Sequence, residues 1–319
     1  DFVPFENRLV STIVQHTFTT DGGDFDPDLS ADGRTLVYAS TRNSLRSDIY
    51  LKSIDGTAVT QITSDPADDI QPRLSPDGRQ IAFTSNRSGN WDIWVVGRDG
   101  TGLRQLTQDM NDEVAPCWSP DGTELAFTLW NRQARRWEIW ALSIDQPGVR
   151  RFLTNGMFPA WSPDGTHIAF QRARQRGTRW YSIWTVELVD GEARYPTEIA
   201  WNSSAACIAP RWSPDGNLLA YCTVSSIPSV SPDTPPAMRA DVWAIALSDG
   251  RRFKLTDGAS PAFNPTWAPS GRVFFVSARQ GAENIWSVSA GAAGEALAQH
   301  ADSPRVTAAP PAPGATQTD

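Results

Sequence analysis

A four-residue turn, Ser-Pro-Asp-Gly or a close variant, recurs along this chain at a near-constant interval. The copies are Ser30–Gly33, Ser75–Gly78, Ser119–Gly122, Ser162–Gly165, Ser213–Gly216 and the degenerate Ala268–Gly271. From glycine to glycine (33, 78, 122, 165, 216, 271) the steps are 45, 44, 43, 51 and 55 residues. Periods of this length are typical of folds that use one supersecondary unit many times. The chain therefore contains six units.

Each unit reads as four short antiparallel strands. In the second unit the turn is followed by the apolar runs Gln80-Ile81-Ala82-Phe83, Asp92-Ile93-Trp94 and Gln105-Leu106-Thr107. Pro presets φ in such a turn and Gly permits a positive φ, so the flanking strands form a hairpin. The pattern predicts an all-β, six-bladed β-propeller of four-stranded blades. The blades are expected at about 24–63, 68–107, 112–154, 157–199, 207–256 and 262–290.

The last blade needs a fourth strand from a chain end, because an open ring would expose an unpaired sheet edge. Two segments compete for this place: residues 10–19 at the N-terminus and residues 295–298 after the sixth blade. The N-terminal segment is richer in β-branched residues, which favour strands. We therefore predict that residues 10–19 close blade six.

Composition limits the possible classes of protein. The repeats indicate one domain over residues 1–300, followed by a Pro- and Ala-rich tail at 301–319. The net charge of −8 and the pI of about 5.0 argue against a nucleic-acid partner. No apolar run reaches the roughly 18 residues of a transmembrane helix. The start at Asp1 without a signal segment is what a processed, exported protein would show.

Two cysteines flank the fifth turn. Cys207 and Cys222 each lie six residues outside Ser213–Gly216, so an unbulged hairpin would place them opposite one another. Cross-strand Cβ atoms at such positions are about 5 Å apart, close to what a disulfide needs. Cys207 and Cys222 are therefore a candidate disulfide, which would imply an oxidising compartment. A bulge at Gly216 would destroy this register. Cys117 is expected to be a small buried residue.

The repeated pattern x-Trp-Ser-Pro-Asp-Gly-x-x-Ile/Leu-Ala-Phe, followed by Asp-Ile-Trp and Leu-Thr, resembles the TolB-type propeller repeat. Residues Cys117–Phe127, Asp92–Trp94 and Leu106–Thr107 show its parts. The resemblance covers nearly the whole chain. It implies a bacterial envelope or periplasmic module that binds proteins, although a fold by itself does not fix an activity. TolB itself has an additional α/β domain before its propeller, for which this chain has no room.

The sequence offers no catalytic constellation. A Gly-x-Ser-x-Gly nucleophile motif is absent, and the three histidines, His16, His167 and His300, fall in different parts of the predicted ring. We therefore expect no catalytic residue, and no cofactor other than a structural Ca²⁺ in the channel.

Acidic side chains are expected near the axis on one face, in the loops that lead from one blade to the next. Converging carboxylates there would suit Ca²⁺, which prefers oxygen ligands. The candidate ligands are Asp24, Asp26, Asp69, Asp112 and Glu113. Solvated loop acids are the alternative interpretation.

Basic and aromatic side chains are expected on the same face, further from the axis, in the loops between the second and third strands. Exposed Trp and Arg are enriched at binding hot spots. The candidate partner-binding residues are Trp91, Trp130, Arg132, Arg135, Arg136, Trp137, Arg174, Arg176, Arg179 and Trp180, with Arg42, Arg46 and Arg87 extending the pattern. In the alternative interpretation, the rings pack between loops with Arg stacked on them. The proline-rich insertion at 225–239 in blade five lies on this face.

These observations favour a non-catalytic, exported propeller that serves as a protein-interaction scaffold or as a subunit of a bacterial envelope assembly. One alternative is a cation-dependent enzyme or glycan-binding protein that uses the acidic channel mouth. A second alternative is the propeller of a larger peptidase similar to prolyl oligopeptidase.

Overall fold

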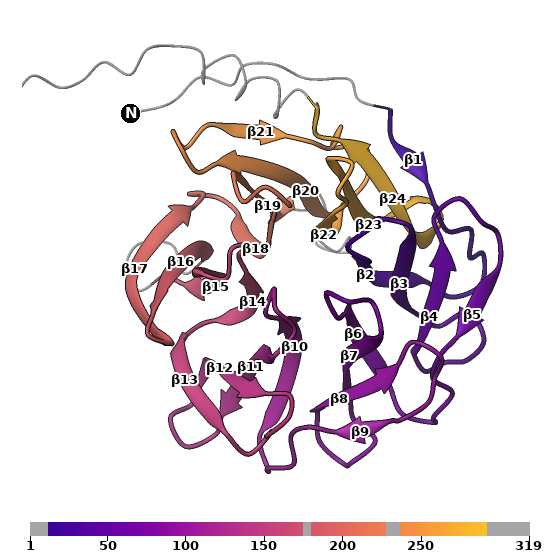
Figure 1. Cartoon of the computed structure of the whole chain (residues 1–319). Helices are drawn as coiled ribbons and strands as arrows, with labels where there is room; N and C mark the ends of the chain where they lie inside the picture. The colour runs from indigo at the N-terminus through magenta and orange to yellow at the C-terminus, as the bar shows by residue number, and fades with distance from the viewer. Residues whose placement is uncertain (1–11, 175–179, 228–236, 292–319) are drawn as a thin grey trace, which may run out of the picture.

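The computed structural model describes residues 12–174, 180–227 and 237–291, which form six four-stranded antiparallel sheets around a common axis (Figure 1). Blade one contains β2 (Asp24–Leu29), β3 (Thr35–Ser40), β4 (Asp48–Ser53) and β5 (Val59–Gln61). Blade two contains β6 (Asp69–Leu74), β7 (Gln80–Ser85), β8 (Asp92–Gly97) and β9 (Arg104–Gln105). Blade three contains β10 (Asp112–Trp118), β11 (Glu124–Asn131), β12 (Arg136–Ser143) and β13 (Arg150–Asn155).

The second half of the ring repeats this order. Blade four contains β14 (Met157–Trp161), β15 (His167–Ala173), β16 (Tyr181–Val189) and β17 (Glu192–Ala200). Blade five contains β18 (Ala206–Trp212), β19 (Leu218–Ile227), β20 (Ala237–Ala246) and β21 (Arg252–Lys254). Blade six contains β22 (Phe263–Trp267), β23 (Arg272–Gln280) and β24 (Ala282–Ser289). Within the described residues, no helix has the length and hydropathy needed to cross a bilayer.

The N-terminal strand completes blade six. β1 (Val14–Gln15) pairs antiparallel with β24, with Val14 opposite Ser287 and Gln15 opposite Trp286. The sheet order is β1-β24-β23-β22, so the last blade has four strands like the others. Both the six-bladed fold and the N-terminal closure are confirmed. The competing segment at 295–298 lies outside the described residues.

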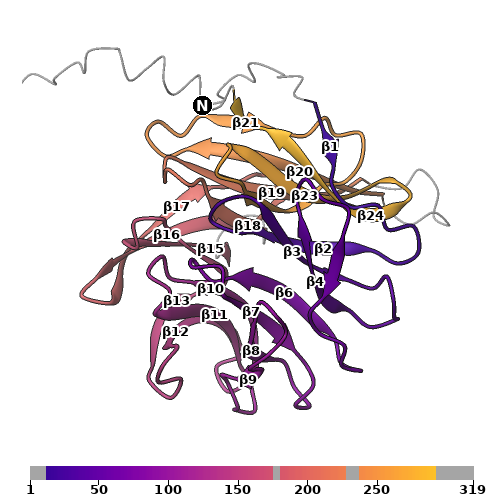
Figure 2. The ribbon, with the colours of Figure 1, turned by 45° about the vertical axis from the view of Figure 1, so that its right-hand side comes forward.

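The innermost strands β2, β6, β10, β14, β18 and β22 surround the axis, each next to the innermost strand of the following blade (Figures 1 and 2). The second strand of each blade supplies one large aromatic ring to the buried layer between blades: Tyr38, Phe83, Phe127, Phe170, Tyr221 and Phe275. Tryptophans before three of the turns link neighbouring blades, because their indole N–H donates to a carbonyl of the preceding blade: Trp118 to Arg73 (3.0 Å), Trp212 to Ala160 (2.9 Å) and Trp267 to Arg211 (3.1 Å).

The Ser-Pro-Asp-Gly turns satisfy their own polar groups. In blade two the Ser75 hydroxyl donates to Asp77 (2.6 Å) and accepts from the Gln80 N–H (2.9 Å), while Asp77 also accepts from the Arg79 N–H (3.1 Å). Gly78 has φ of 68°, which only glycine adopts at low cost. The same bonds recur in the turns of blades one, three, four and five. This chemistry fixes the hairpins that the sequence predicts.

Every innermost strand carries a β-bulge at the residue before a proline. The φ of these residues lies between 48° and 55°, and the register with the second strand shifts at this point in each blade. The bulged residues are Asp26, Gln71, Ala115, Phe158, Ala209 and Asn264. A bulge turns the following side chains to a new direction. It therefore sets which residues of the innermost strands face the axis.

Candidate functional site

One face of the ring carries most of the irregular surface. We name it the loop face: it is formed by the loops between the second and third strands and by the loops that lead from one blade to the next. The opposite face, with the Ser-Pro-Asp-Gly turns, is the turn face. Five exposed large apolar side chains lie on or beside the loop face: Phe18, Leu45, Met110, Trp201 and Met238. Exposed apolar side chains of this kind are typical of surfaces that bind other molecules.

The hairpin of β11 and β12 projects from the loop face of blade three. Trp130 and Trp137 are a cross-strand pair whose ring centroids are 5.0 Å apart. Both rings are half-buried, and they are followed at the tip by exposed Arg132, Arg135 and Arg136. Cross-strand aromatic pairs stabilise a hairpin and present a rigid apolar surface at the same time.

The three arginines of this hairpin differ in their partners. Arg136 contacts the buried Glu138 carboxylate at 2.8 Å, and Arg132 lies 3.7 Å from Asp112. Arg135 occupies the turn with φ of 51°, and its side chain has no ion-pair partner in the described part of the chain. The guanidinium of Arg135 is therefore available to an incoming carboxylate.

The arginines of blade four are only partly available. Arg174 forms an ion pair with Glu198 at 3.1 Å and lies over the exposed Trp201 ring at 4.7 Å. Trp180 is half-buried. Arg176 and Arg179 lie outside the described residues, as does most of the insertion at 225–239. Arg174 therefore stacks on an aromatic ring, as the alternative interpretation of the basic loops expects.

Trp91 of blade two is half-buried beside blade three, and its backbone N–H donates to the Asp112 carboxylate at 3.3 Å. Among the basic residues of blades one and two, Arg46 remains largely exposed and pairs with Asp68 at 2.7 Å. The β11–β12 hairpin therefore groups three exposed arginines with two half-buried tryptophans, and the exposed Trp201 lies under Arg174 in blade four.

Two of the candidate calcium ligands are held by arginines. Asp24 is fully buried and lies 3.0 Å from the Arg42 guanidinium, and Asp69 is fully buried and lies 2.7 Å from Arg87. Each arginine stands 18 residues after its acid, in the loop that follows the second strand of the same blade. These carboxylates serve in ion pairs inside the blades.

Glu113 occupies the equivalent position in blade three, but Asn131 replaces the arginine. Asn131 is engaged with Glu138 instead (3.2 Å), and no donor of the described residues reaches the buried Glu113 oxygens. Burial, together with the nearby carboxyl groups of Asp109 and Asp92, raises the pKa of Glu113 to about 10. Burial acts to raise the pKa of the Asp109 carboxyl, but the neighbouring Glu113 side chain, the Asn111 N–H and Arg150 outweigh it and lower that pKa.

The remaining two candidates have other surroundings. Asp26 faces the axis from β2, and Asp112 lies at the start of β10 beside Trp91 and Arg132. Within residues 12–174, 180–227 and 237–291, no three His, Cys, Asp or Glu side chains are grouped so as to hold a metal ion. The structure therefore does not gather the five predicted calcium ligands into one site.

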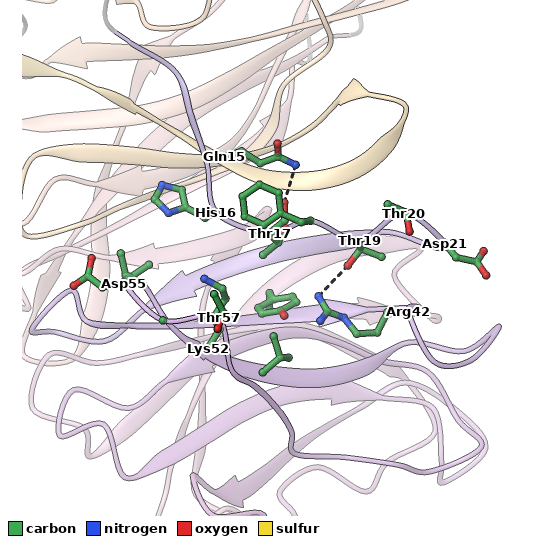
Figure 3. Close-up of a pocket in the computed structure, with 15 residues that line it drawn as sticks. Gln15, His16, Thr17, Thr19, Thr20, Asp21, Arg42, Lys52, Asp55 and Thr57 are labelled. Carbon is green, nitrogen blue, oxygen red and sulfur yellow. Dashed lines mark hydrogen bonds between the residues drawn. The ribbon is translucent and has the colours of Figure 1, made fainter.

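A pocket of about 550 Å³ lies at the seam where the N-terminal segment meets blade one (Figure 3). Gln15 to Asp21 form one wall, and Arg42, Lys52 and residues 54–57 form the other. Figure 3 shows Arg42 directed towards Thr19, to which it donates a hydrogen bond of 2.9 Å. Burial, together with the charges of Arg272 and Lys52, lowers the pKa of His16 to about 4, so its ring is neutral at physiological pH. The walls carry both signs of charge and do not favour one class of ligand.

The model of the TolB β-propeller domain matches residues 7–199, which is more than half of the chain. The chain belongs to the TolB β-propeller domain family. No curated protein sequence matches it.

Solved structures similar to this TolB-type propeller include proteins with different activities. A TolB candidate from Agrobacterium tumefaciens has 22% identity and a TM-score of 0.64, covering 86% of this chain and 96% of its own. An oligogalacturonate lyase in complex with manganese has 13% identity and a TM-score of 0.58, covering 88% and 93%. A puromycin-hydrolysing peptidase of Mycobacterium tuberculosis has 14% identity and a TM-score of 0.55, covering 81% of this chain and 49% of its own. Identities this low support the fold alone.

The predicted disulfide is absent from this TolB-type propeller. Cys207 and Cys222 are both free thiols. The bulge at Ala209 shifts the register, so that Cys207 lies opposite Thr223 and Cys222 lies opposite Ile208. Cys222 instead donates to the Ala262 carbonyl of blade six at 3.1 Å. The prediction fails because the turn pairs Trp212 with Leu219, two positions beyond the register expected from the sequence, and the bulge at Ala209 takes back only one of the two. Cys117, expected to be buried, is partly exposed.

Proposed function

We propose that this chain is a non-catalytic binding module that contacts a protein partner through the loop face of blades three and four. The Trp130–Trp137 pair carries the proposal, because it places two large rings beside a guanidinium that has no acidic partner in the described residues. Trp and Arg are the residues that most often dominate the energy of protein interfaces. The partner surface would offer an apolar patch with a carboxylate at its edge.

The contrast between the two faces supports the choice of the loop face. On the turn face, the hydroxyl and carboxylate of each Ser-Pro-Asp-Gly turn are already bonded within the turn. On the loop face, Arg135, Met110 and Trp201 are exposed. Loops of variable length on a rigid scaffold are where proteins usually place their binding residues.

We further propose that the protein acts in the bacterial envelope, outside the cytoplasm, as a scaffold or as a subunit of an assembly. The TolB β-propeller family match and the similarity to a TolB candidate support this location. Fractionation of the source cells, with the protein detected by antibody, tests it: recovery with the cytoplasmic fraction would contradict export.

The binding proposal is tested by capture of partners from a bacterial envelope extract. The variants are Arg135→Glu and Trp137→Ala, and the matched control is Arg79→Glu, which makes the same charge change on the turn face at an exposed residue. We expect a partner that the wild type and Arg79→Glu retain and that both loop-face variants lose. Equal melting temperatures of the four proteins show that the loss is not due to unfolding.

Retention of the same partner by Arg135→Glu and Trp137→Ala would remove the hairpin from the interface. Failure of the wild type to retain any protein would count against the binding module itself. Truncation of a buried interface Trp typically costs about 2 kcal/mol or more, which is a more than tenfold loss of affinity.

A further inference from the structure

The second residue after each bulge forms a ring around the axis that the function proposed above does not use. We name it the axial ring: Asp28, Arg73, Cys117, Ala160, Arg211 and Thr266, one residue from each innermost strand. Two arginines in such a ring are unusual, because side chains at the centre of a fold are seldom charged without a partner.

The side chains of this ring interact across the axis. Arg211 of blade five interacts electrostatically with Arg73 of blade two, with Cys117 of blade three and with Asp28 of blade one. None of these blades is a neighbour of blade five in the ring. Such interactions require side chains that point to the common centre. In a ring of six, blades two and five stand opposite each other, so the two guanidinium groups approach the axis from opposite sides.

The acids near the axis are already satisfied by hydrogen bonds. Asp28 accepts from the Leu74 N–H at 3.0 Å and from the Thr266 hydroxyl at 3.4 Å. Asp26 accepts from the Gln71 N–H at 3.2 Å and from the Asn264 amide at 2.7 Å. Burial raises the pKa of both carboxyl groups, although the two arginines oppose this. The carboxylates are thus committed to the strands beside them.

The two arginines, in contrast, leave most of their donors unused. Arg73 donates to the carbonyl of its own neighbour Pro72 at 2.7 Å, and Arg211 donates to that of Pro210 at 3.1 Å. The Nε of Arg73 is buried and has no hydrogen-bond partner. In the described part of the chain, neither guanidinium lies within 4.0 Å of a carboxylate. A guanidinium has five N–H donors, so each has several left for a ligand.

The two positive charges also oppose one another. Burial, and after it the charge of Arg73, lowers the pKa of Arg211 to about 10. Both side chains are partly exposed although they come from innermost strands. They therefore retain some surface that water can reach. Two like charges held in this way are stabilised when an anion binds between them.

We propose that the axial ring binds a small oxyanion, a carboxylate or phosphate group, held between the guanidinium groups of Arg73 and Arg211. The planar fork of arginine matches the geometry of these groups and can bond two of their oxygens at once. This site is separate from the Trp130–Trp137 hairpin on the loop face.

The test is calorimetric titration of the purified protein at low ionic strength with two probes, inorganic phosphate and succinate. The variants are Arg73→Gln and Arg211→Gln, and the control is Arg79→Gln, an exposed arginine of the turn face. We expect the wild type and Arg79→Gln to bind at least one probe, and each axial variant to bind it at least about tenfold more weakly. Phosphate alone would identify a phosphoryl ligand, succinate alone a carboxylate, and both would support the oxyanion class.

The melting temperatures of the proteins without a probe show whether Arg73 and Arg211 serve to bind a ligand or to stabilise the fold. Because removal of one charge relieves the repulsion, we expect each axial variant to melt at or above the temperature of the wild type. The proposal is overturned if neither probe binds the wild type with a Kd below about 1 mM. It is also overturned if both axial variants bind as the wild type does, or if both melt well below it. Arg135→Glu should bind the probes normally, so failure of the loop-face proposal would not affect this result.

Discussion

Replacement of Glu113 by Gln is expected to stabilise the fold at neutral pH. The Glu113 carboxyl is fully buried between blades two and three, without the arginine that its counterparts in blades one and two possess. Burial, Asp109 and Asp92 raise its pKa from 4.5 to about 10. The folded protein must therefore hold a proton that the unfolded chain releases. Gln has nearly the same shape, is always neutral, and can donate to Asp109.

The size of the effect follows from the two pKa values. Above pH 4.5 the unfolded chain loses the proton while the folded chain keeps it, so this group lowers the free energy of unfolding as pH rises. The slope is about 1.4 kcal/mol per pH unit. At pH 7 the cost reaches about 3 kcal/mol, since 2.5 units separate that pH from the unfolded value of 4.5. Below pH 4.5 both states are protonated and the cost disappears.

The assay is urea unfolding of the wild type and Glu113→Gln at several values between about pH 4 and pH 8. We expect the difference in free energy of unfolding to be near zero at the acid end and to grow to about 3 kcal/mol at pH 7. Taking the difference removes the titration of other groups that both proteins share. A difference that does not change with pH, or a variant less stable than the wild type at pH 7, would refute the reasoning.

Asp69→Asn is the matched control, because Asp69 has the same place in blade two but is paired with Arg87. Removal of this acid takes the close carboxylate partner from the largely buried Arg87 guanidinium, which then has only Asp65, at 4.0 Å. We expect a loss of about 3–5 kcal/mol, the opposite sign to Glu113→Gln. The two substitutions together test whether the arginine decides the behaviour of the buried acid.

Three further outcomes are expected. Ala31→Pro restores the proline of the other turns and places a proline ring near Gly78, as four of the other five turn glycines have. It should raise the free energy of unfolding by about 0.4–1 kcal/mol in urea titrations; a decrease would show that Ala31 does not share their backbone. Gly156→Ala should lower the free energy of unfolding by about 1–3 kcal/mol, because the added Cβ would overlap the buried Phe170 ring. An unchanged urea midpoint would contradict this packing. By NMR, His16 should titrate near pH 4 rather than near 6.5. Between these two values the unfolded chain binds a proton that the folded protein does not, so the free energy of unfolding decreases as pH falls from 6.5 to about 4. A midpoint above about 6 would exclude the burial of His16.

The sequence predicts the fold well because the turn chemistry is local. Ser, Asp and Gly at fixed offsets form the same hydrogen bonds in each of the first five turns, whatever the rest of the blade contains. The closing strand was also predictable, since only a chain end could complete the last blade and the N-terminal segment is the better strand former. These arguments need no knowledge of distant contacts.

The candidate site was harder to predict, because its chemistry depends on pairing across strands and blades. The register that separates Cys207 from Cys222 is set by the turn, which pairs Trp212 with Leu219, and by the bulge at Ala209. The signal of the bulge in the sequence is the proline that follows Ala209. A proline at the same place in all six innermost strands could have revealed the bulge. The partners of Asp24 and Asp69 are likewise visible in the sequence, as arginines that follow each acid by 18 residues. Arg42 and Arg87 belong to the predicted basic surface, but in the structure they neutralise buried acids.

The closure of blade six by β1 also decides when the ring can form. The His16 ring forms a hydrogen bond with the Ser287 hydroxyl, 271 residues further along the chain. β1 therefore cannot pair until β24 has been synthesised. Contacts between residues this far apart in sequence form late, because a long loop must close before they contribute. During synthesis, blades one to five can fold one after another as they emerge, while β1 remains unpaired. The chain therefore passes through an open, unclosed state whose edge strands are exposed until β24 has been made.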